Sequence, residues 1–182
     1  MEHRCLGTEH QFPTSVLIYL ELLIDRLLSN MSKLYKGACF CGSVSYEVTG
    51  PPILRAYCHC TYCQRLAGAP FVHSIHFPTT AFRWTHKQPD CDVLDSFVPP
   101  AKPHKTRYRC KNCGVCVASK NNLAGKTSVW ATHLERDEKG ALVHWDDLKP
   151  TAHIYYDTHV MDINDELSKW TGYENESEQI HT

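Results

Sequence analysis

The 182-residue sequence lacks any long, uninterrupted hydrophobic run. Its most apolar stretch, residues 15–28, is broken by Glu21, Asp25 and Arg26. The stretch is therefore shorter than the roughly 18 to 20 apolar residues that a membrane span needs. The opening also lacks the basic segment, unbroken apolar stretch and small-residue cleavage site of a secretory signal. We therefore expect a cytoplasmic protein without a membrane segment.

The sequence also lacks an excess of charge of either sign. Its 19 Lys and Arg residues and 20 Asp and Glu residues give a net charge of −1. A protein that binds nucleic acid or an anionic membrane concentrates basic residues on one face. No internal repeat or low-complexity segment is present either. We therefore expect a globular protein with neither nucleic acid nor membrane as a partner.

The first 30 residues differ in pattern from the rest of the chain. Apolar side chains recur there at helical spacing, at Leu17, Leu20, Ile24, Leu27 and Leu28. This spacing predicts an amphipathic helix. Two interpretations remain open: the helix lies on the domain that follows, or residues 1–30 are a dispensable extension and Met31 is the functional start.

From Lys36 onward the apolar pattern has the period of a strand. In GSVSYEVTG, Val44, Tyr46 and Val48 alternate with polar residues, as in a half-buried strand. Four further segments also predict strands: APFVHSIHFP, KTRYRC, KTSVWATHLE and AHIYYD. We expect helix only in the N-terminal stretch, after Cys63 and in LSKW. The sequence therefore predicts one mostly β domain over residues 31–173, followed by a polar, frayed tail at 174–182.

Cysteine, in contrast, is abundant, with ten residues. In a cytosolic protein this number favours metal or redox chemistry over disulfides. Cysteines one or two positions apart bring two sulfurs close enough to share one ion, and C-x-x-C followed by glycine is typical of a zinc knuckle. Seven of the ten fall in three clusters: Cys39-Phe40-Cys41, Cys58-His59-Cys60-Thr61-Tyr62-Cys63 and Cys110-Lys111-Asn112-Cys113-Gly114.

Seven ligands do not divide into two sets of four. A structural zinc takes four protein ligands, whereas a catalytic zinc has three and keeps one position open. The simplest division is therefore one closed set of four and one open set of three, with two zinc ions per chain. The contiguous Cys58, Cys60 and Cys63 are the natural open set. The closed set is then Cys39, Cys41, Cys110 and Cys113.

Other cysteines and histidines have simpler explanations. We expect Cys91 to be a free thiol in a polar loop and Cys116 to be a buried small side chain. His59 lies between two expected ligands, so its side chain should point away from the metal. His73 and His76 fall on opposite faces of one expected strand, so at most one of them faces the site.

Together these motifs resemble the glutathione-dependent formaldehyde-activating enzyme family, also known as the centromere protein V domain family. The shared order is C-x-C-G, then C-H-C-x-x-C-x-R, then C-x-x-C-G. GACFCGSVSYEVTGPP is similar to the family's opening strand and YCHCTYCQRLAGAPF to its central motif. The resemblance runs from about Lys36 to Trp170. It implies a zinc-binding β-tent fold of antiparallel sheets.

The resemblance also implies roles for particular residues. It implies a carbon–sulfur lyase that adds a thiol such as glutathione to a small aldehyde such as formaldehyde, giving an S-hydroxyalkyl adduct, or that runs the reverse reaction. Arg65 in the central motif is a candidate to hold a glutathione carboxylate, with a structural salt bridge as the alternative. By motif position, the set Cys39, Cys41, Cys110 and Cys113 matches the structural zinc, and the set Cys58, Cys60 and Cys63 matches the catalytic zinc.

A second interpretation belongs to a different class of protein. The domain would then be a zinc-stabilised binding module without turnover, in which every cysteine is structural. The charge of the open set bears on this choice, because three thiolates around Zn²⁺ leave one negative charge. That charge weakens Lewis acidity and disfavours a further anionic ligand. The enzyme interpretation therefore requires compensating groups nearby.

Overall fold

The computed structural model describes residues 14–31 and 33–181, and it is mostly β, as predicted. Its helices are short apart from α1 (Thr14–Met31), and they include α2 (Thr61–Ala67), α3 (Asp90–Val93) and α4 (Trp145–Leu148). The strands are β1 (Leu34–Ala38), β2 (Ser45–Thr49), β3 (Leu54–Cys58), β4 (Val72–Pro78), β5 (Phe82–Trp84), β6 (Leu94–Phe97), β7 (Lys105–Cys110), β8 (Cys116–Asn121), β9 (Lys126–Trp130), β10 (Ala152–Ile154), β11 (Ser168–Trp170) and β12 (Gln179–Ile180).

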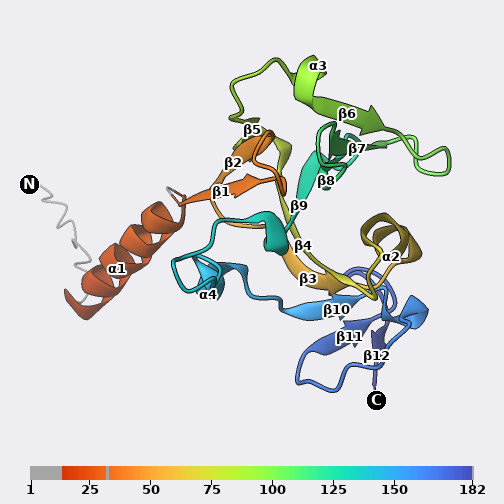
Figure 1. Ribbon diagram of the computed structural model, residues 1–182. Helices are drawn as coiled ribbons and strands as arrows, with labels where there is room; N and C mark the ends of the chain where they lie inside the picture. Colours follow the sequence, from red (N-terminus) through yellow and green to blue (C-terminus); the bar gives the residue numbers. More distant parts are fainter. Residues whose placement is uncertain (1–13, 32, 182) are drawn as a thin grey trace, which may run out of the picture.

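The strands form two sheets (Figure 1). The small sheet has the order β1-β2-β5, and the large sheet has the order β12-β11-β10-β3-β4-β9-β8-β7-β6. Most neighbours are antiparallel, but β10 runs parallel to both β3 and β11. The large sheet is therefore mixed, unlike the purely antiparallel sheets that we expected. The parallel strands β10 and β11 are joined by residues 155–167, which is the long connection that a parallel pair requires.

Apolar side chains from both sheets form the main core. It contains Tyr46 and Val48 of the small sheet and Ile75 and Phe77 of β4, all nearly inaccessible to solvent. Gly37 of β1 is required here, because a Cβ atom at this position would collide with the ring of Tyr46. The packing leaves the opposite face of β4 free to face a cavity. That face carries Ser74 and His76.

The five strands predicted from alternation are confirmed as β2, β4, β7, β9 and β10. The helix expected in LSKW is wrong, because Ser168–Trp170 forms β11 against β10. The tail is not frayed within residues 174–181, since β12 pairs with β11 and Thr151 Oγ1 donates to Glu174 at 2.7 Å. In both places a free sheet edge offers backbone hydrogen bonds that local sequence patterns do not reveal.

The N-terminal helix is present over Thr14–Met31 but does not lie on the sheets (Figure 1). Its described side chains are exposed, including Ile18, Leu22 and Ile24, each with more than half of its surface accessible. Leu17, Leu27 and Leu28, which contributed to the predicted apolar stripe, have side chains outside the described set. Within residues 14–31 and 33–181, no helix is long and apolar enough to cross a membrane.

Candidate metal centres and active-site cavity

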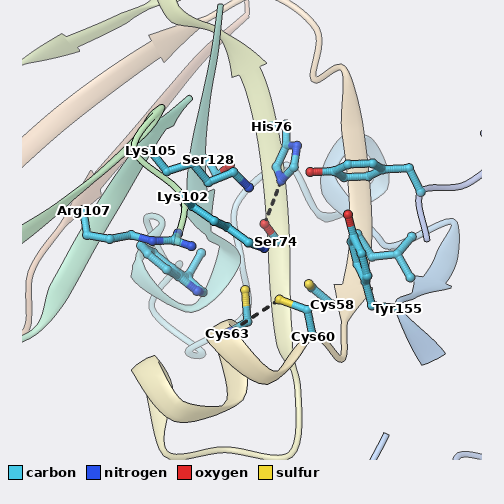
Figure 2. Close-up of a pocket in the computed structure, with 13 residues that line it drawn as sticks. Cys58, Cys60, Cys63, Ser74, His76, Lys102, Lys105, Arg107, Ser128 and Tyr155 are labelled. Carbon is cyan, nitrogen blue, oxygen red and sulfur yellow. Dashed lines mark hydrogen bonds between the residues drawn. The ribbon is translucent and has the colours of Figure 1, made fainter. Parts of the chain in front are cut away.

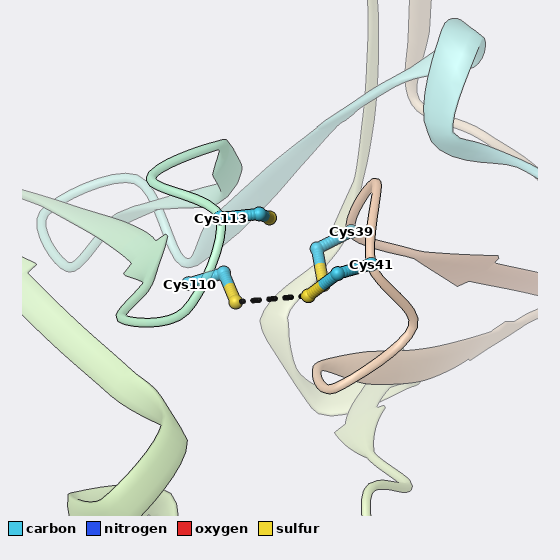
Figure 3. Close-up of side chains that lie close together, drawn as sticks. All are labelled: Cys39, Cys41, Cys110 and Cys113. Atoms are coloured by element: carbon cyan, nitrogen blue, oxygen red, sulfur yellow. Dashed lines mark hydrogen bonds between the residues drawn. The ribbon is translucent and has the colours of Figure 1, made fainter.

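Four cysteines from two distant turns meet at one point (Figure 3). Their sulfur atoms all lie within 4.8 Å of one another. The Cys39 and Cys41 sulfurs are 3.6 Å apart, and the Cys41 and Cys110 sulfurs are 3.8 Å apart. A disulfide holds its sulfurs at about 2.05 Å, so these contacts are not disulfides. The four residues are those of the expected closed set: Cys39, Cys41, Cys110 and Cys113.

Two glycine turns shape this four-cysteine cluster. Gly42 follows Cys41 with φ of 78°, and Gly114 follows Cys113 with φ of 75°, a backbone region that favours glycine. Backbone and side-chain donors point at the sulfurs, with Val44 N 3.3 Å from Cys39 Sγ and Asn112 Nδ2 3.3 Å from Cys41 Sγ. The cluster therefore links the β1–β2 turn to the β7–β8 turn.

A second cluster contains Cys58, Cys60 and Cys63, whose sulfurs also lie within 4.8 Å of one another. Cys58 ends β3, Cys60 is the N-cap of α2 and Cys63 lies in its first turn. The backbone N–H of Cys63 is 3.4 Å from Cys60 Sγ. Within the described residues, no fourth His, Cys, Asp or Glu joins this cluster.

Ionisation of one of these three thiols disfavours ionisation of the others. Hydrogen bonds from Cys58 and Cys63 lower the pKa of Cys60 to about 2, while the bond to Cys60 is the main cause that raises the pKa of Cys58. The three thiols therefore cannot all ionise by themselves. A bound cation reverses this balance, because a coordinating thiol is deprotonated outright. The cluster is electrostatically suited to a metal ion.

The three-cysteine cluster opens into a cavity (Figure 2). The cavity volume is about 30 Å³, which leaves room for only a few atoms. Cysteines form its base, and one face of the large sheet forms its wall. A larger groove of about 590 Å³ shares Trp130 with this cavity. The cavity is lined by Cys58, Cys60, Cys63, Ser74, His76, Lys102, Lys105, Arg107, Ser128, Trp130, Ile154, Tyr155 and Tyr173.

Three cations, Lys102, Lys105 and Arg107, line one side of this cavity, and we call them the cationic wall (Figure 2). Arg107 is only 8% exposed. Burial, followed by the neighbouring Arg107 and Lys102, lowers the pKa of Lys105. The cavity lining contains no Asp or Glu. The wall therefore presents positive charge directly to the cysteine sulfurs.

Two further groups at the cavity are neutral at physiological pH. Burial lowers the pKa of His76 to about 3, and its Nε2 is 3.1 Å from Ser74 Oγ. Burial also raises the pKa of Tyr155, so its phenol keeps its proton. Tyr155 has φ of 54°, an uncommon conformation for a non-glycine residue. Such strain persists only where the surrounding structure fixes it, and it is concentrated at functional sites.

The segment between Cys58 and Cys60 is held by buried polar contacts. His59 is fully buried, and its Nε2 lies 2.8 Å from His153 Nδ1. His153 Nε2 is in turn 3.0 Å from Asp165 Oδ2. The His59 carbonyl accepts hydrogen bonds from Gln64 Nε2 at 2.6 Å and Thr158 Oγ1 at 3.0 Å. These contacts fix the loop between the two cysteines.

Comparison with known proteins gives one family match. Residues 34–158 match the model of the family described as glutathione-dependent formaldehyde-activating enzyme. The chain belongs to this family. A solved structure of a Rhodobacter sphaeroides protein is similar at 20% sequence identity, covering 57% of this chain and 92% of that chain, with a TM-score of 0.43. Comparison with curated proteins gives no match.

Both cysteine clusters of this glutathione-dependent formaldehyde-activating family member fit a zinc ion. With Zn–S bonds of about 2.3 Å, a tetrahedral site separates its sulfurs by roughly 3.8 Å. The sulfur distances of 3.6 and 3.8 Å in the four-cysteine cluster agree with this value. Because none of these sulfurs is in a disulfide, all are available as ligands. The two clusters can therefore each hold a metal ion.

Arg65, the candidate for glutathione binding from the family motif, is exposed on the last turn of α2 and does not line the cavity. It lies two residues after Cys63, and positions two apart point to different sides of a helix. No ion pair between described residues involves it either. The cations at the cavity come instead from the loop and strand at residues 102–107.

The remaining expectations concern single side chains. Cys91 is an exposed free thiol. Cys116 is partly buried and packs against the apolar cluster that contains Cys58 and Cys63, and burial raises its pKa to about 11. His76 faces the cavity whereas His73 lines the larger groove, so one of the two faces the site, as predicted.

Proposed function

We propose that this protein is a zinc-dependent carbon–sulfur lyase. It adds a thiol such as glutathione to a small aldehyde such as formaldehyde, forming an S-hydroxyalkyl adduct, or catalyses the reverse. Membership of the family supports this reaction class. The observation that carries the proposal is that Cys58, Cys60 and Cys63 form a cluster of three that opens into a cavity.

Zinc held by Cys58, Cys60 and Cys63 would supply Lewis acidity that favours the thiolate form of the incoming thiol. Binding a thiolate at this negatively charged centre requires positive charge nearby, and the protein supplies it. Three thiolates and Zn²⁺ leave one negative charge, and the cationic wall lies beside it. Lys102 is held over the Tyr62 ring, with Nζ 4.3 Å from its centroid. The wall therefore meets the requirement for compensating charge.

In the addition, the thiol loses its proton and its sulfur forms a bond to the carbonyl carbon. The electron pair of the C=O double bond moves to oxygen, which then takes up a proton. Tyr155 lines the cavity and keeps its phenolic proton because burial raises its pKa. We therefore assign Tyr155 as the proton donor to this oxygen, and as the acceptor in the reverse direction. The proton that the thiol loses passes to solvent, and Tyr155 takes a proton back from solvent.

The four-cysteine cluster has a different role in this proposal. Cys39, Cys41, Cys110 and Cys113 supply a complete set of four ligands, as in a structural zinc site. Their zinc would tie the β1–β2 turn to the β7–β8 turn. Reduced cysteines at both clusters suit the cytoplasm, which is the compartment we propose.

A non-catalytic, zinc-stabilised binding module is the alternative. In such a module the second cluster would also be structural, but it supplies only three of the four protein ligands of a structural zinc. Burying cations beside this cavity without a counterion costs stability. The presence of the buried Arg107 there favours the enzyme.

Metal analysis of matched variants tests the proposal. We expect two zinc ions per wild-type chain. Replacing Cys58, Cys60 and Cys63 together by Ser should leave a folded protein with one zinc and no catalysis of thiol–aldehyde addition. The matched control is Cys91→Ser, an exposed thiol outside both clusters, which should retain two zinc ions and full activity. Normal turnover by the triple variant would overturn the assignment.

A further inference from the structure

The cationic wall carries more positive charge than the three-cysteine cluster requires. Three thiolates around one dication leave a single negative charge, whereas Lys102, Lys105 and Arg107 carry one positive charge each. Two positive charges therefore remain unmatched. No carboxylate lines the cavity, and no ion pair between described residues involves these three cations. Lys102 and Lys105 are part-exposed, but Arg107 is buried. Buried charge without a partner is costly, so the position of Arg107 needs an explanation.

Arg107 is placed by the sheet and not by a flexible loop. In the register of the large sheet, His76 lies opposite Ser128, Ser128 opposite Ser119, and Ser119 opposite Arg107. Its side chain is more than nine-tenths buried yet lines the cavity. Lys105 lies two residues earlier on β7 and therefore on the same face. A planar guanidinium held this way matches a carboxylate with two parallel hydrogen bonds.

The size of the cavity limits where such a carboxylate sits on the substrate. About 30 Å³ beside the cysteines leaves room for only a few atoms. The carboxylates of glutathione lie several bonds from its sulfur and would extend outside this space. A carboxylate on the carbon that is bonded to sulfur in the adduct would lie directly beside this space, as close to the sulfur as a carboxylate can be.

We infer that the site selects an adduct with the arrangement S–C–COO⁻, in which the carboxylate contacts Arg107 and Lys105. This inference rests on the proposed thiol–aldehyde reaction. Either substrate can supply the carboxylate: an aldehyde that carries it directly on the carbonyl carbon, or a thiol that carries it on the carbon next to sulfur. Lys102 remains beside the cysteine sulfurs and offsets their charge.

Two pairs of substrates show whether the aldehyde or the thiol supplies the carboxylate. Glyoxylate is compared with glycolaldehyde, using 2-mercaptoethanol as the thiol, and mercaptoacetate is compared with 2-mercaptoethanol, using formaldehyde. We expect kcat/KM, divided by the uncatalysed rate, to be at least tenfold higher for the carboxylate in one pair, which is the usual effect of a hydrogen-bonded buried charge. Arg107→Met should reduce this preference to within twofold, whereas Lys139→Met, on an exposed loop, should keep it. Lys105→Met provides the same test if Arg107→Met does not fold.

Calorimetry separates this inference from the proposed reaction. Acetate and acetamide have the same shape but differ in charge, and neither reacts with a thiol. Tighter binding of acetate, lost in Arg107→Met or Lys105→Met, supports the carboxylate site even if no aldehyde is turned over, a result that would overturn the proposed reaction alone. Equal binding of both, together with no preference in either kinetic pair, would overturn the inference and leave the reaction standing.

Discussion

At the residue scale, the cavity brings together side chains whose pKa values are strongly shifted. These side chains come from distant parts of the sequence. The cysteines of each motif are one or two positions apart, and counting them as ligands predicted which motifs form each cluster. The cationic wall was not predictable in this way, because Arg107 reaches the cysteines only through the pairing of β7, β8, β9 and β4. Tyr155 was missed for a similar reason, since its left-handed backbone depends on tertiary contacts. Arg65 was a candidate to hold a glutathione carboxylate, but α2 turns it outward, away from the cavity.

Replacing Tyr155 by Phe tests the role of its hydroxyl. We expect the rate of addition to fall about 100-fold, the usual contribution of a positioned proton donor. The zinc content and thermal stability should not change, since the ring remains. Tyr108→Phe is the matched control, because Tyr108 lies on β7 outside this cavity. An unchanged rate in Tyr155→Phe would assign proton transfer to another group.

Buried His76 should make stability depend on pH. Burial lowers its pKa to about 3 in the folded protein, whereas the unfolded chain has the ordinary value near 6.5. Between these values the unfolded chain takes up a proton and the folded protein does not. The contribution of His76 to the free energy of unfolding is therefore highest above pH 6.5 and falls as the pH is lowered toward 3. From pH 7 to 5 the loss from this group is about 2 kcal/mol.

Urea unfolding of the wild type and of His76→Gln, both with excess zinc, measures this pH-dependent contribution of His76 to stability. The variant should lose about 2 kcal/mol less than the wild type between pH 7 and pH 5. Loss of metal at low pH affects both proteins and cancels in the difference. Parallel pH profiles would show that His76 is able to take up a proton in the folded state.

At the element scale, the sequence pattern predicted β2 of the small sheet and β4, β7, β9 and β10 of the large sheet, but not β3 and β8 between them. It also failed for β11 and β12, short strands at one end of the large sheet whose pairing depends on tertiary contacts. The N-terminal helix was predicted, but its described side chains are exposed and it stands apart from the sheets (Figure 1). We propose that residues 1–30 form an extension separate from the domain at residues 31–173.

The four-cysteine cluster should stabilise the fold by linking the β1–β2 turn to the β7–β8 turn. Cys110 is fully buried at the end of β7 and joins this turn to the β1–β2 turn. We expect Cys110→Ser to unfold the domain at 37 °C, because structural zinc contributes about 10–16 kcal/mol in small zinc-finger domains. Circular dichroism during heating measures the effect. A melting temperature within a few degrees of that of Cys91→Ser would show that the cluster has no structural role.

At the scale of the whole molecule, two sheets bring seven cysteines into two unequal clusters, one of four and one of three. The four-cysteine cluster links the turns of both sheets, whereas the three-cysteine cluster faces a cavity with a cationic wall. The division into four and three was predicted by counting ligands. What the fold adds is the environment of each cluster, which sequence spacing does not encode.

The central claim is that the three-cysteine centre accepts a thiolate from outside the protein. Cobalt-substituted protein tests this directly, because each thiolate bound to Co²⁺ adds sulfur-to-metal charge-transfer absorption in the near ultraviolet. We expect glutathione to increase this absorption in the wild type, and S-methylglutathione, which cannot form a thiolate, to leave it unchanged. A spectrum that saturating glutathione does not alter would show that the centre is closed and would contradict the account.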